Sequence, residues 1–288
     1  MKHFLIYTNR HKDKDLATAK RIRDYLERKG QQASVKISEG GWKETEAGEK
    51  DGFPPDIPLD VDCMLVLGGD GTVLQAARET MRRNIPIIGV NLGTLGYMTE
   101  IEPANLEESL DRLIEGDYEQ ESRMMLNGRA YLGQGRTAEG WALNDIVISR
   151  SGSLQIIRFD IYVNGQFLNG YSADGMIVTT PTGSTGYNLS AGGPLIEPRA
   201  RLIMLTPICP HTLNQRSIIL SPEDVIEIEI PRGKDGRVQT VEASFDGSYV
   251  IPLSTGDKIR IAKSEKMTEF IQLNQVSFLE ALHKKMAE

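Results

Sequence analysis

The 288-residue chain has few cysteines, no long apolar run and no excess of positive charge. Its two cysteines, Cys63 and Cys209, are far apart in sequence and cannot by themselves form a disulfide framework or a zinc site. No apolar stretch approaches the roughly 20 residues of a membrane-spanning helix. A net charge of −7 disfavours nucleic-acid binding, which depends on clustered lysine and arginine. The first residues lack a signal-peptide pattern, so we expect a cytoplasmic protein.

Two familiar nucleotide-binding signatures are also missing. The sequence contains no G-x-x-x-x-G-K-[ST] motif, which excludes an ordinary P-loop. It contains no G-x-G-x-x-G motif either. A relaxed form at residues 133–138 has no strand–turn–helix context, and we interpret it as a loop. This absence disfavours a dehydrogenase.

The pattern of apolar residues predicts two domains. Residues 1–117 alternate strand-like and helix-like segments, which is typical of a Rossmann-like open α/β domain. Residues 118–265 contain successive strand-like segments separated by turns, which predicts a β-sandwich-like domain. We assign a C-terminal helix within residues 266–288 to the first domain, and a capping box from Ser277 to Glu280 predicts its helical start at Phe278.

One segment of the first domain lacks any regular pattern. Residues 38–60 are rich in Gly, Glu, Lys and Pro and show little periodicity. We expect them to form an exposed, mobile loop.

An acidic residue stands in a glycine-rich turn directly after a predicted buried strand. The apolar run Cys63 to Leu67 is followed by Gly68-Gly69-Asp70-Gly71-Thr72 and then by a helix-forming segment. Open α/β sheets bind ligands at this position, where glycine N–H groups and a helix N-terminus favour phosphate. Asp70 would there accept a proton, hold Mg²⁺ or simply cap the helix.

Three further stretches place polar residues next to predicted strands. The segment from Asn91 to Tyr97 contains Gly93 and Gly96, and we expect it to lie beside the first turn. Asn144-Asp145 interrupts an apolar run, so this pair hydrogen-bonds internally or faces a cleft. Residues 180–188 supply hydroxyls, backbone donors and an aromatic ring that can pack on a base.

In this order, the four stretches resemble the NAD kinase family over residues 60 to 250. G-G-D-G alone also occurs in lipid kinases. NAD kinases are distinguished by its combination with three further motifs: N-x-G-x-x-G-Y, N-[ED] and D-G-x-x-x-x-T-P-T-G-S-T-x-Y. The resemblance implies transfer of the γ-phosphate of ATP, another nucleotide or polyphosphate to the 2′-hydroxyl of the adenosine ribose of NAD. It also implies a divalent metal such as Mg²⁺, a last helix that packs on the first domain, and a homodimer or homotetramer.

The resemblance also implies roles for individual residues. Asp70 matches the proton acceptor, Asp174 lies near the nicotinamide, and His211 is a neighbour without assigned chemistry. The donor phosphates are assigned to Gly68, Gly69, Gly71 and Thr72, with Asn91, Gly93 and Tyr97 as further neighbours. The NAD-binding set comprises Asp70, Gly71, Asn144, Asp145, Asp174, Thr185, Gly186, Tyr187, Asn188, Ser190 and Ser248. No residues are assigned as metal ligands.

The chain departs from the family pattern at four positions. Many members have Glu where Asp145 stands, and bacterial relatives often carry Arg where Ser172 stands. Several relatives have Gln in place of Ser248 and Ala in place of Gly186. These differences concern affinity and the preference for NAD or NADH more than the reaction.

Two other classes of function stay open on the residues alone. A lipid or sugar kinase can use the same Gly-Gly-Asp-Gly turn, but it needs an apolar acyl cavity and residues 180–188 are polar. A sensor would bind NAD(H) or NADP(H) without transferring phosphate. Formation of NADP from NAD, ATP and Mg²⁺ separates the NAD kinase from both.

Overall fold

The computed structural model describes residues 1–38, 57–81, 83–93, 96–152, 156–211, 216–274 and 278–286. Most of the loop predicted at residues 38–60 and Ser277 of the predicted capping box lie outside these ranges. The chain divides into two compact units: unit 1 is Met1–Arg123 with Met267–Glu288, and unit 2 is Met124–Lys266. None of the helices in the described ranges is long and apolar enough to span a membrane.

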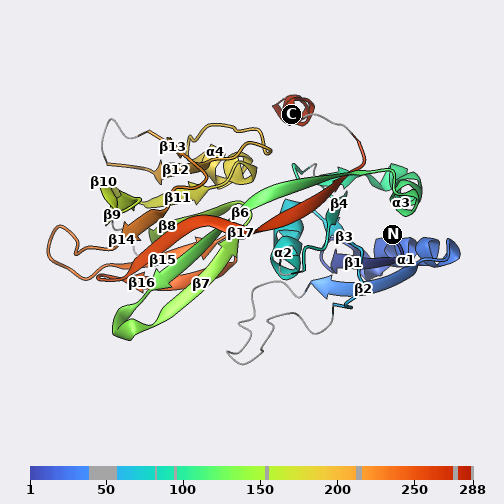
Figure 1. Cartoon of the computed structure of the whole chain (residues 1–288), viewed down its shortest axis with the longest axis horizontal. Coiled ribbons are helices and arrows are strands. Elements are labelled where there is room, and N and C mark those ends of the chain that lie inside the picture. The colour runs from blue at the N-terminus through green and yellow to red at the C-terminus, as the bar shows by residue number, and fades with distance from the viewer. Residues whose placement is uncertain are drawn as a thin grey trace. The chain divides into compact units, whose positions relative to one another are not determined.

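Unit 1 contains a parallel sheet with the strand order β2-β1-β3-β4 (Figure 1). Its strands are β1 (His3–Asn9), β2 (Gln32–Ser38), β3 (Cys63–Gly68) and β4 (Ile87–Asn91), with the short β5 (Thr99–Ile101) beside β4. All these strands are parallel, but the chain adds β2 on one side of β1 and then β3 on the other side. Open α/β sheets bind ligands at the carboxyl ends of the two strands that flank such a switch point, here β1 and β3. The glycine-rich turn begins at the end of β3.

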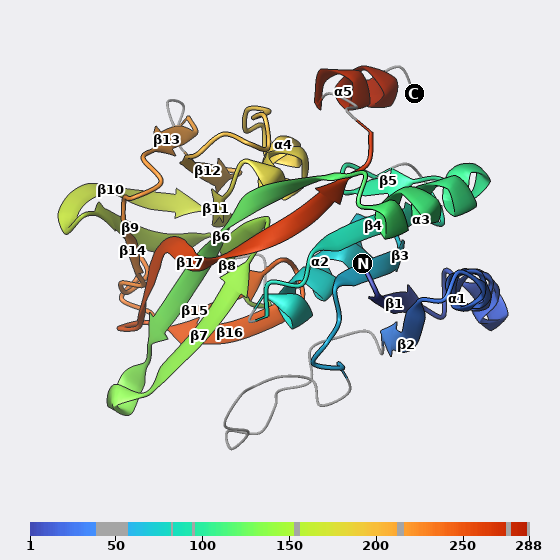
Figure 2. The same cartoon turned by 45° about the vertical axis from the view of Figure 1, so that its right-hand side comes forward.

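Helices cover both faces of this sheet (Figure 2). The helices are α1 (Ala17–Arg28), α2 (Asp70–Thr80) and α3 (Leu106–Glu115), with short 3-10 turns at Lys14–Leu16 and Pro103–Asn105. α1 and α3 share one apolar core with alternate side chains of the strands, including Phe4 and Leu65. Tyr7, on the other face, donates a hydrogen bond to Glu79 of α2. Because both faces are covered, every residue of β3 is buried.

Unit 2 consists of antiparallel strands. One sheet has the order β13-β12-β11-β8-β15-β16. Its strands are Ile218–Leu220, Ile203–Ile208, Gly175–Thr179, Asp145–Arg150, Thr240–Phe245 and Tyr249–Ser254, in that order. The other strands of unit 2 are β7 (Thr137–Ala142), β9 (Ile157–Val163), β10 (Gln166–Ala173) and β14 (Ile226–Glu229). Two longer strands, β6 (Glu119–Tyr131) and β17 (Lys258–Gln272), belong partly to each unit. The predicted combination of an α/β unit and an all-β unit is confirmed.

Short helical segments connect some of the strands of unit 2. A 3-10 turn at Thr182–Thr185 leads into the four-residue helix α4 (Tyr187–Ser190). Another 3-10 turn, Gly133–Gly135, connects β6 to β7. The G-x-G-like sequence is therefore a hairpin connection, as predicted, and not a nucleotide loop.

The C-terminal helix does not occupy the whole range 266–288. Residues 266–272 are the last part of β17, in which the buried Thr268 and Phe270 stand two positions apart with the more exposed Glu269 between them, and Ile271 is buried as well. This two-residue period indicates a strand despite the lysines and glutamates that favour a helix. The helix α5 spans Phe278–Met286. Within unit 1 it lies against the second glycine-rich segment, since the Lys285 ammonium is 3.9 Å from the centre of the Tyr97 ring.

Candidate functional site

The carboxylate of Asp70 is fixed by backbone groups from the second glycine-rich segment. Asp70 is the first residue of α2, and its Oδ2 and Oδ1 accept hydrogen bonds from the N–H groups of Tyr97 at 2.9 Å and Met98 at 3.0 Å. Gly69 is the N-cap of α2, and the hydrogen bonds that the Asp70 carboxylate makes with described residues go to Tyr97 and Met98, not to the N–H groups of α2. Helix capping is therefore excluded as its role, and the expected closeness of the two glycine turns is confirmed.

Two glycines are required by close approaches around Asp70. A Cβ on Gly96 would lie 2.0 Å from Asp70 Oδ1, and a Cβ on Gly68 would lie 2.4 Å from Thr72 Oγ1. Among the described residues, Gly69 and Gly71 have no neighbour within 4 Å of such a Cβ, so there is room for a ligand beside their backbone. The first N–H groups of α2 precede its hydrogen-bonded turns and are available to an anion.

A cation that the sequence analysis did not single out lies at the same edge of the sheet. Lys12 follows β1, and its Nζ lies 3.9 Å from the position of a Cβ on Gly93. Lys12, Asn91 and Gly93 line a hollow of about 640 Å³ in unit 1. The sequence contains one signal for Lys12, which is its position after β1. The strand order of the sheet changes direction between β1 and β3, and ligands bind at such a point.

In unit 2, the Asn144-Asp145 pair is held by a third residue, Asp246. The carboxylate of Asp246 accepts hydrogen bonds from the backbone N–H groups of Leu143 at 2.9 Å, Asn144 at 2.8 Å and Asp145 at 3.1 Å. Asp246 and Gly247 form the turn between β15 and β16, with φ angles of 47° and 66°. The sequence analysis assigned only the neighbouring Ser248, which hydrogen-bonds the carbonyl oxygen of Phe245 within this turn.

Burial and a neighbouring carboxylate alter the ionisation of Asp145. Its side chain is 6% exposed. Loss of solvent, and secondly the negative charge of Asp246, raise the pKa of Asp145 from 3.8 to about 7. Near neutral pH, the protonated and the ionised form of Asp145 are therefore present in comparable amounts.

The raised pKa of Asp145 predicts a pH-dependent stability. Between about pH 4 and pH 7 the folded chain binds a proton at Asp145 that the unfolded chain has lost, so the free energy of unfolding falls as the pH rises through this window. Asp145→Asn has no proton to lose at this position and removes this fall in the free energy of unfolding. In urea unfolding, its stability advantage over the wild type should widen by on the order of 2 kcal/mol from pH 5 to pH 8. The exposed control Asp24→Asn should show no widening, and a constant difference for Asp145→Asn would contradict the assignment.

The threonine-rich segment packs against Asn144 and leaves polar atoms for a ligand. The carbonyl oxygen of Asn144 accepts hydrogen bonds from the Thr180 N–H and the Thr179 hydroxyl, both at 2.9 Å. Asn144 Oδ1 and Thr182 Oγ1 are buried without a hydrogen-bond partner among the described residues. Buried polar atoms are rarely left unpaired, so both fit partners supplied by a bound molecule.

The remaining residues of this segment have different surroundings. Tyr187 is 47% exposed, and Thr185 and Ser190 also reach the surface. Asn188 is fully buried, with its amide bonded to Ser184, Pro194 and Thr206, so it positions the segment and offers no free polar group. A Cβ on Gly186 would lie 3.4 Å from the Asn144 amide nitrogen, so Gly186 lies close to the Asn144 side chain.

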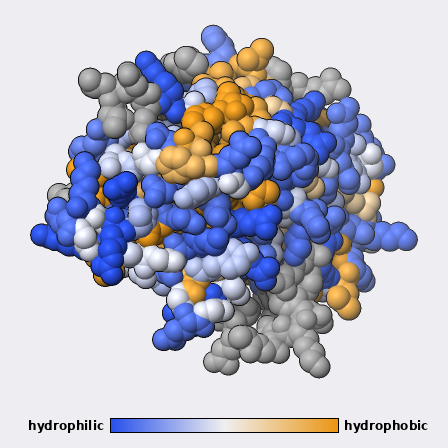
Figure 3. Space-filling model, turned by 60° about the vertical axis from the view of Figure 1, so that its left-hand side comes forward, coloured by the Kyte–Doolittle hydropathy of each residue, from blue (hydrophilic) through white to orange (hydrophobic). Residues whose placement is uncertain are grey.

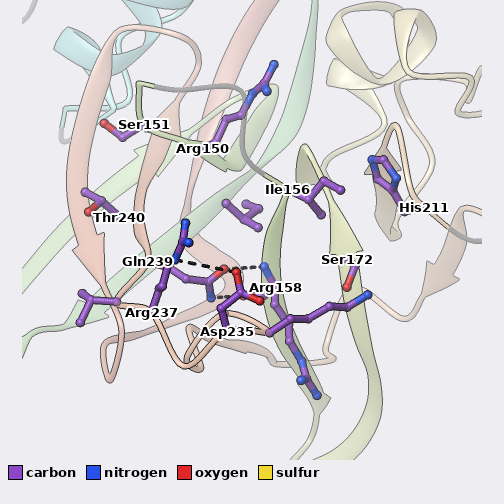
Figure 4. Close-up of a pocket in the computed structure, with 14 residues that line it drawn as sticks. Arg150, Ser151, Ile156, Arg158, Ser172, His211, Asp235, Arg237, Gln239 and Thr240 are labelled. Carbon is purple, nitrogen blue, oxygen red and sulfur yellow. Dashed lines mark hydrogen bonds and ion pairs between the residues drawn. The ribbon is translucent and has the colours of Figure 1, made fainter.

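Asp174, Ser172 and His211 lie away from the start of β8. Asp174 accepts a backbone hydrogen bond from Arg150 at the end of β8, and its Oδ2 lies 3.8 Å from Arg150 Nη2. Ser172 accepts a backbone hydrogen bond from His211, and both residues line a cavity with Arg150 (Figure 4). Arg150 therefore supplies a guanidinium to the same cavity that Ser172 lines.

The described part of the chain offers no ready-made metal cage. It contains no group of three or more His, Cys, Asp or Glu side chains that could hold a metal ion. Cys63 is a buried free thiol and Cys209 an exposed one.

Comparison with known proteins identifies close similarity along the whole chain. Residues 4–118 match the model of the ATP-NAD kinase N-terminal domain, and residues 143–273 match that of the ATP-NAD kinase C-terminal domain. The chain is 48% identical to the NAD kinase of Lachnospira eligens, over 99% of this chain and 100% of the relative. It is 45% identical to the NAD kinase of Agathobacter rectalis, over 99% of each protein.

Solved structures show the same fold. The crystal structure of an NAD kinase from Archaeoglobus fulgidus in complex with ATP has a TM-score of 0.76 and 26% identity, covering 100% of both chains. The crystal structure of yeast NADH kinase complexed with NADH has a TM-score of 0.87 and 22% identity, covering 100% of this chain and 88% of that one.

Proposed function

The chain belongs to the ATP-NAD kinase family and converts NAD to NADP with ATP, and we propose that Asp70 accepts the proton of the attacking 2′-hydroxyl. The observation that carries this proposal is the fixed Asp70 carboxylate in the open glycine turn. Each carboxylate oxygen there accepts one N–H and has further lone-pair capacity. Asp70 can therefore accept a proton without moving.

Unit 2 supplies the polar groups that suit the acceptor ribose. Asn144 Oδ1 and Thr182 Oγ1 lack partners among the described residues, and Asp145 lies in the same turn. Ribose hydroxyls are donors and acceptors, so they can satisfy both atoms. We therefore assign the ribose to Asn144 and Asp145, with Asp246 as the residue that positions them.

Tyr187 is the proposed contact for a base of NAD, because its ring is exposed and the preceding residue, Gly186, lies close to the Asn144 amide. Tyr187→Ala should weaken NAD binding about tenfold, since an aromatic contact and its buried area contribute on the order of 1–2 kcal/mol. Isothermal titration calorimetry with NAD measures this directly. Tyr187→Phe keeps the ring and should bind NAD almost as the wild type does. Equal affinities for Tyr187→Ala and the wild type would remove Tyr187 from this role.

The donor phosphates are assigned to unit 1. The open backbone at Gly69 and Gly71, the N-terminus of α2 and the ammonium of Lys12 all favour negative charge at the carboxyl edge of the sheet. Phosphoryl transfer needs mainly positioning and charge stabilisation, which these groups provide. Rates with ATP, GTP and inorganic polyphosphate, measured under equal conditions, would define the range of donors.

A divalent cation, Mg²⁺ by preference, is proposed to enter with the donor. Mg²⁺ commonly keeps several waters and binds through substrate phosphates and one or two carboxylates, which agrees with the lack of a protein metal cage in the described ranges. When bound, it would neutralise charge on the triphosphate. The cytoplasmic location expected from the sequence stays a prediction.

We also propose that the chain forms a homodimer or homotetramer. Figure 3 shows hydrophobic residues gathered on one face of unit 2. Phe167 is 60% exposed and lies with Leu168 on β10, the end strand of its sheet path. Exposed apolar side chains on an edge strand favour association. Light scattering after size-exclusion chromatography gives the subunit number.

A further inference from the structure

Unit 2 contains a cavity of about 510 Å³ that the proposed mechanism does not use (Figure 4). The cavity lies at the end of β8, at Arg150, whereas the proposed ribose site lies at its start, at Asp145. Five residue steps along an extended strand separate these ends by roughly 17 Å. The cavity volume is within the range of about 300–1,000 Å³ that is typical of small-molecule sites.

Positive charge surrounds this cavity although the chain as a whole carries a net charge of −7. Its lining includes the cations Arg150, Arg158, Lys234 and Arg237 and one carboxylate, Asp235. Arg237 is paired with Asp235, with 3.8 Å between Nε and Oδ2. Within the described ranges, neither the Arg158 guanidinium nor the Lys234 ammonium has a carboxylate partner. Two cations are therefore available to an anionic ligand.

The cavity walls are joined by the side-chain amide of Gln239, a half-buried residue. Gln239 Oε1 accepts the N–H of Arg158 at 2.8 Å, and Gln239 Nε2 donates to the carbonyl oxygens of Arg158 at 2.9 Å and Pro231 at 2.6 Å. Figure 4 shows the bonds between Gln239 and Arg158. This network fixes the backbone of β9 against the segment that carries Lys234 and leaves both cationic side chains unengaged.

Apolar side chains stand next to these cations. Ile156 is 50% exposed and Val238 is 64% exposed, and both line the cavity. Cations suited to phosphate and apolar carbon suited to a flat ring occur together in sites for nucleotides.

We infer that this cavity binds a second phosphorylated small molecule, a nucleotide carrying a di- or triphosphate, separately from the substrates of the reaction. Arg158 and Lys234 contact the phosphates, because charge-assisted hydrogen bonds are about twice as strong as neutral ones. Ile156 and Val238 contact the base.

The experiment counts binding sites for ADP and for inorganic pyrophosphate by isothermal titration calorimetry. The full-length wild type is compared with the double variant Arg158→Gln/Lys234→Gln. We expect the wild type to bind one more equivalent of ADP per chain, because each lost charge-assisted contact weakens binding about tenfold. Pyrophosphate should show the same difference with lower affinity, since it cannot contact Ile156 and Val238. The kcat and the KM values for NAD and ATP should stay within about twofold of the wild type.

A matched double variant controls for the loss of two charges. Arg129→Gln/Arg260→Gln changes two exposed cations of unit 2 that do not line the cavity, and it should keep the wild-type number of ADP sites. An unchanged number and affinity of ADP sites in Arg158→Gln/Lys234→Gln would overturn the inference. A rise in the KM for NAD that parallels the loss of ADP binding would also overturn it, because the cavity would then belong to the substrate site. Equal affinities for ADP and pyrophosphate would refute the contact with a base.

Discussion

Asp70→Asn should lower kcat by about 10²- to 10⁴-fold, the usual contribution of a general base, while the affinity for NAD changes less than about threefold. The amide oxygen can still accept one backbone N–H, but the amide cannot take a proton from the 2′-hydroxyl. Coupled formation of NADP measures kcat, and calorimetry measures NAD binding. Near-full turnover of Asp70→Asn would show that another group accepts the proton.

A second variant moves the Asp70 carboxylate without removing it. In Gly96→Ala the new Cβ would lie 2.0 Å from Asp70 Oδ1, so the carboxylate or the turn has to shift. We expect kcat to fall in this variant as well, with its unfolding temperature as a check on folding. The exposed control Asp24→Asn should keep full activity. Full activity of Gly96→Ala would mean that the position of the carboxylate is not critical.

Asp246→Ala should destabilise the protein by about 3 kcal/mol and weaken NAD binding by at least tenfold. The substitution removes the acceptor for three backbone N–H groups, and hydrogen bonds to charged groups contribute about 1.5–3 kcal/mol each before water replaces part of them. The turn that carries Asn144 and Asp145 then loses its anchor. Urea unfolding and NAD calorimetry measure the two effects, and kcat at saturating NAD should fall less than the affinity.

Two further variants separate this positioning role from a general loss of structure. Asp246→Asn keeps the acceptor for the Asn144 and Asp145 N–H groups at one oxygen and removes the charge, so it should recover most of the NAD affinity and lower the pKa of Asp145. Gln134→Ala substitutes another residue with positive φ in a hairpin turn and should leave NAD binding unchanged. A loss of stability in Asp246→Ala without a loss of NAD affinity would contradict the role.

Much of the fold and part of the site follow from local sequence patterns. The apolar run at Cys63 to Leu67 predicts a strand covered on both faces, and the structure buries every residue of β3. Glycine readily adopts the left-handed conformation that ends a helix, and Gly116 after α3 does so with a φ of 84°. The strand at residues 266–272 was missed because its lysines and glutamates favour a helix, whereas burial on alternate positions is decided by the surrounding sheet.

The residues missed at the site have a different cause. Asp246 acts on backbone groups about 100 positions earlier in the chain, and Lys12 reaches Gly93 from the end of another strand. A contact of this kind leaves no periodicity or local spacing in the sequence. Asn188 was instead assigned to ligand binding because it lies in a conspicuous polar segment. The sequence did not indicate that its side chain is buried and hydrogen-bonded to three other residues.

The sequence by itself determined the two kinds of unit, the order of the glycine-rich and polar stretches, and the position of Asp70 after a buried strand. Periodicity and turn chemistry act between near neighbours, so these features are visible in the chain. Only the tertiary structure decided that Tyr97 and Met98 hold the Asp70 carboxylate from 27 and 28 positions away. It also decided the raised pKa of Asp145, because desolvation and the charge of Asp246 arise only when distant segments pack together.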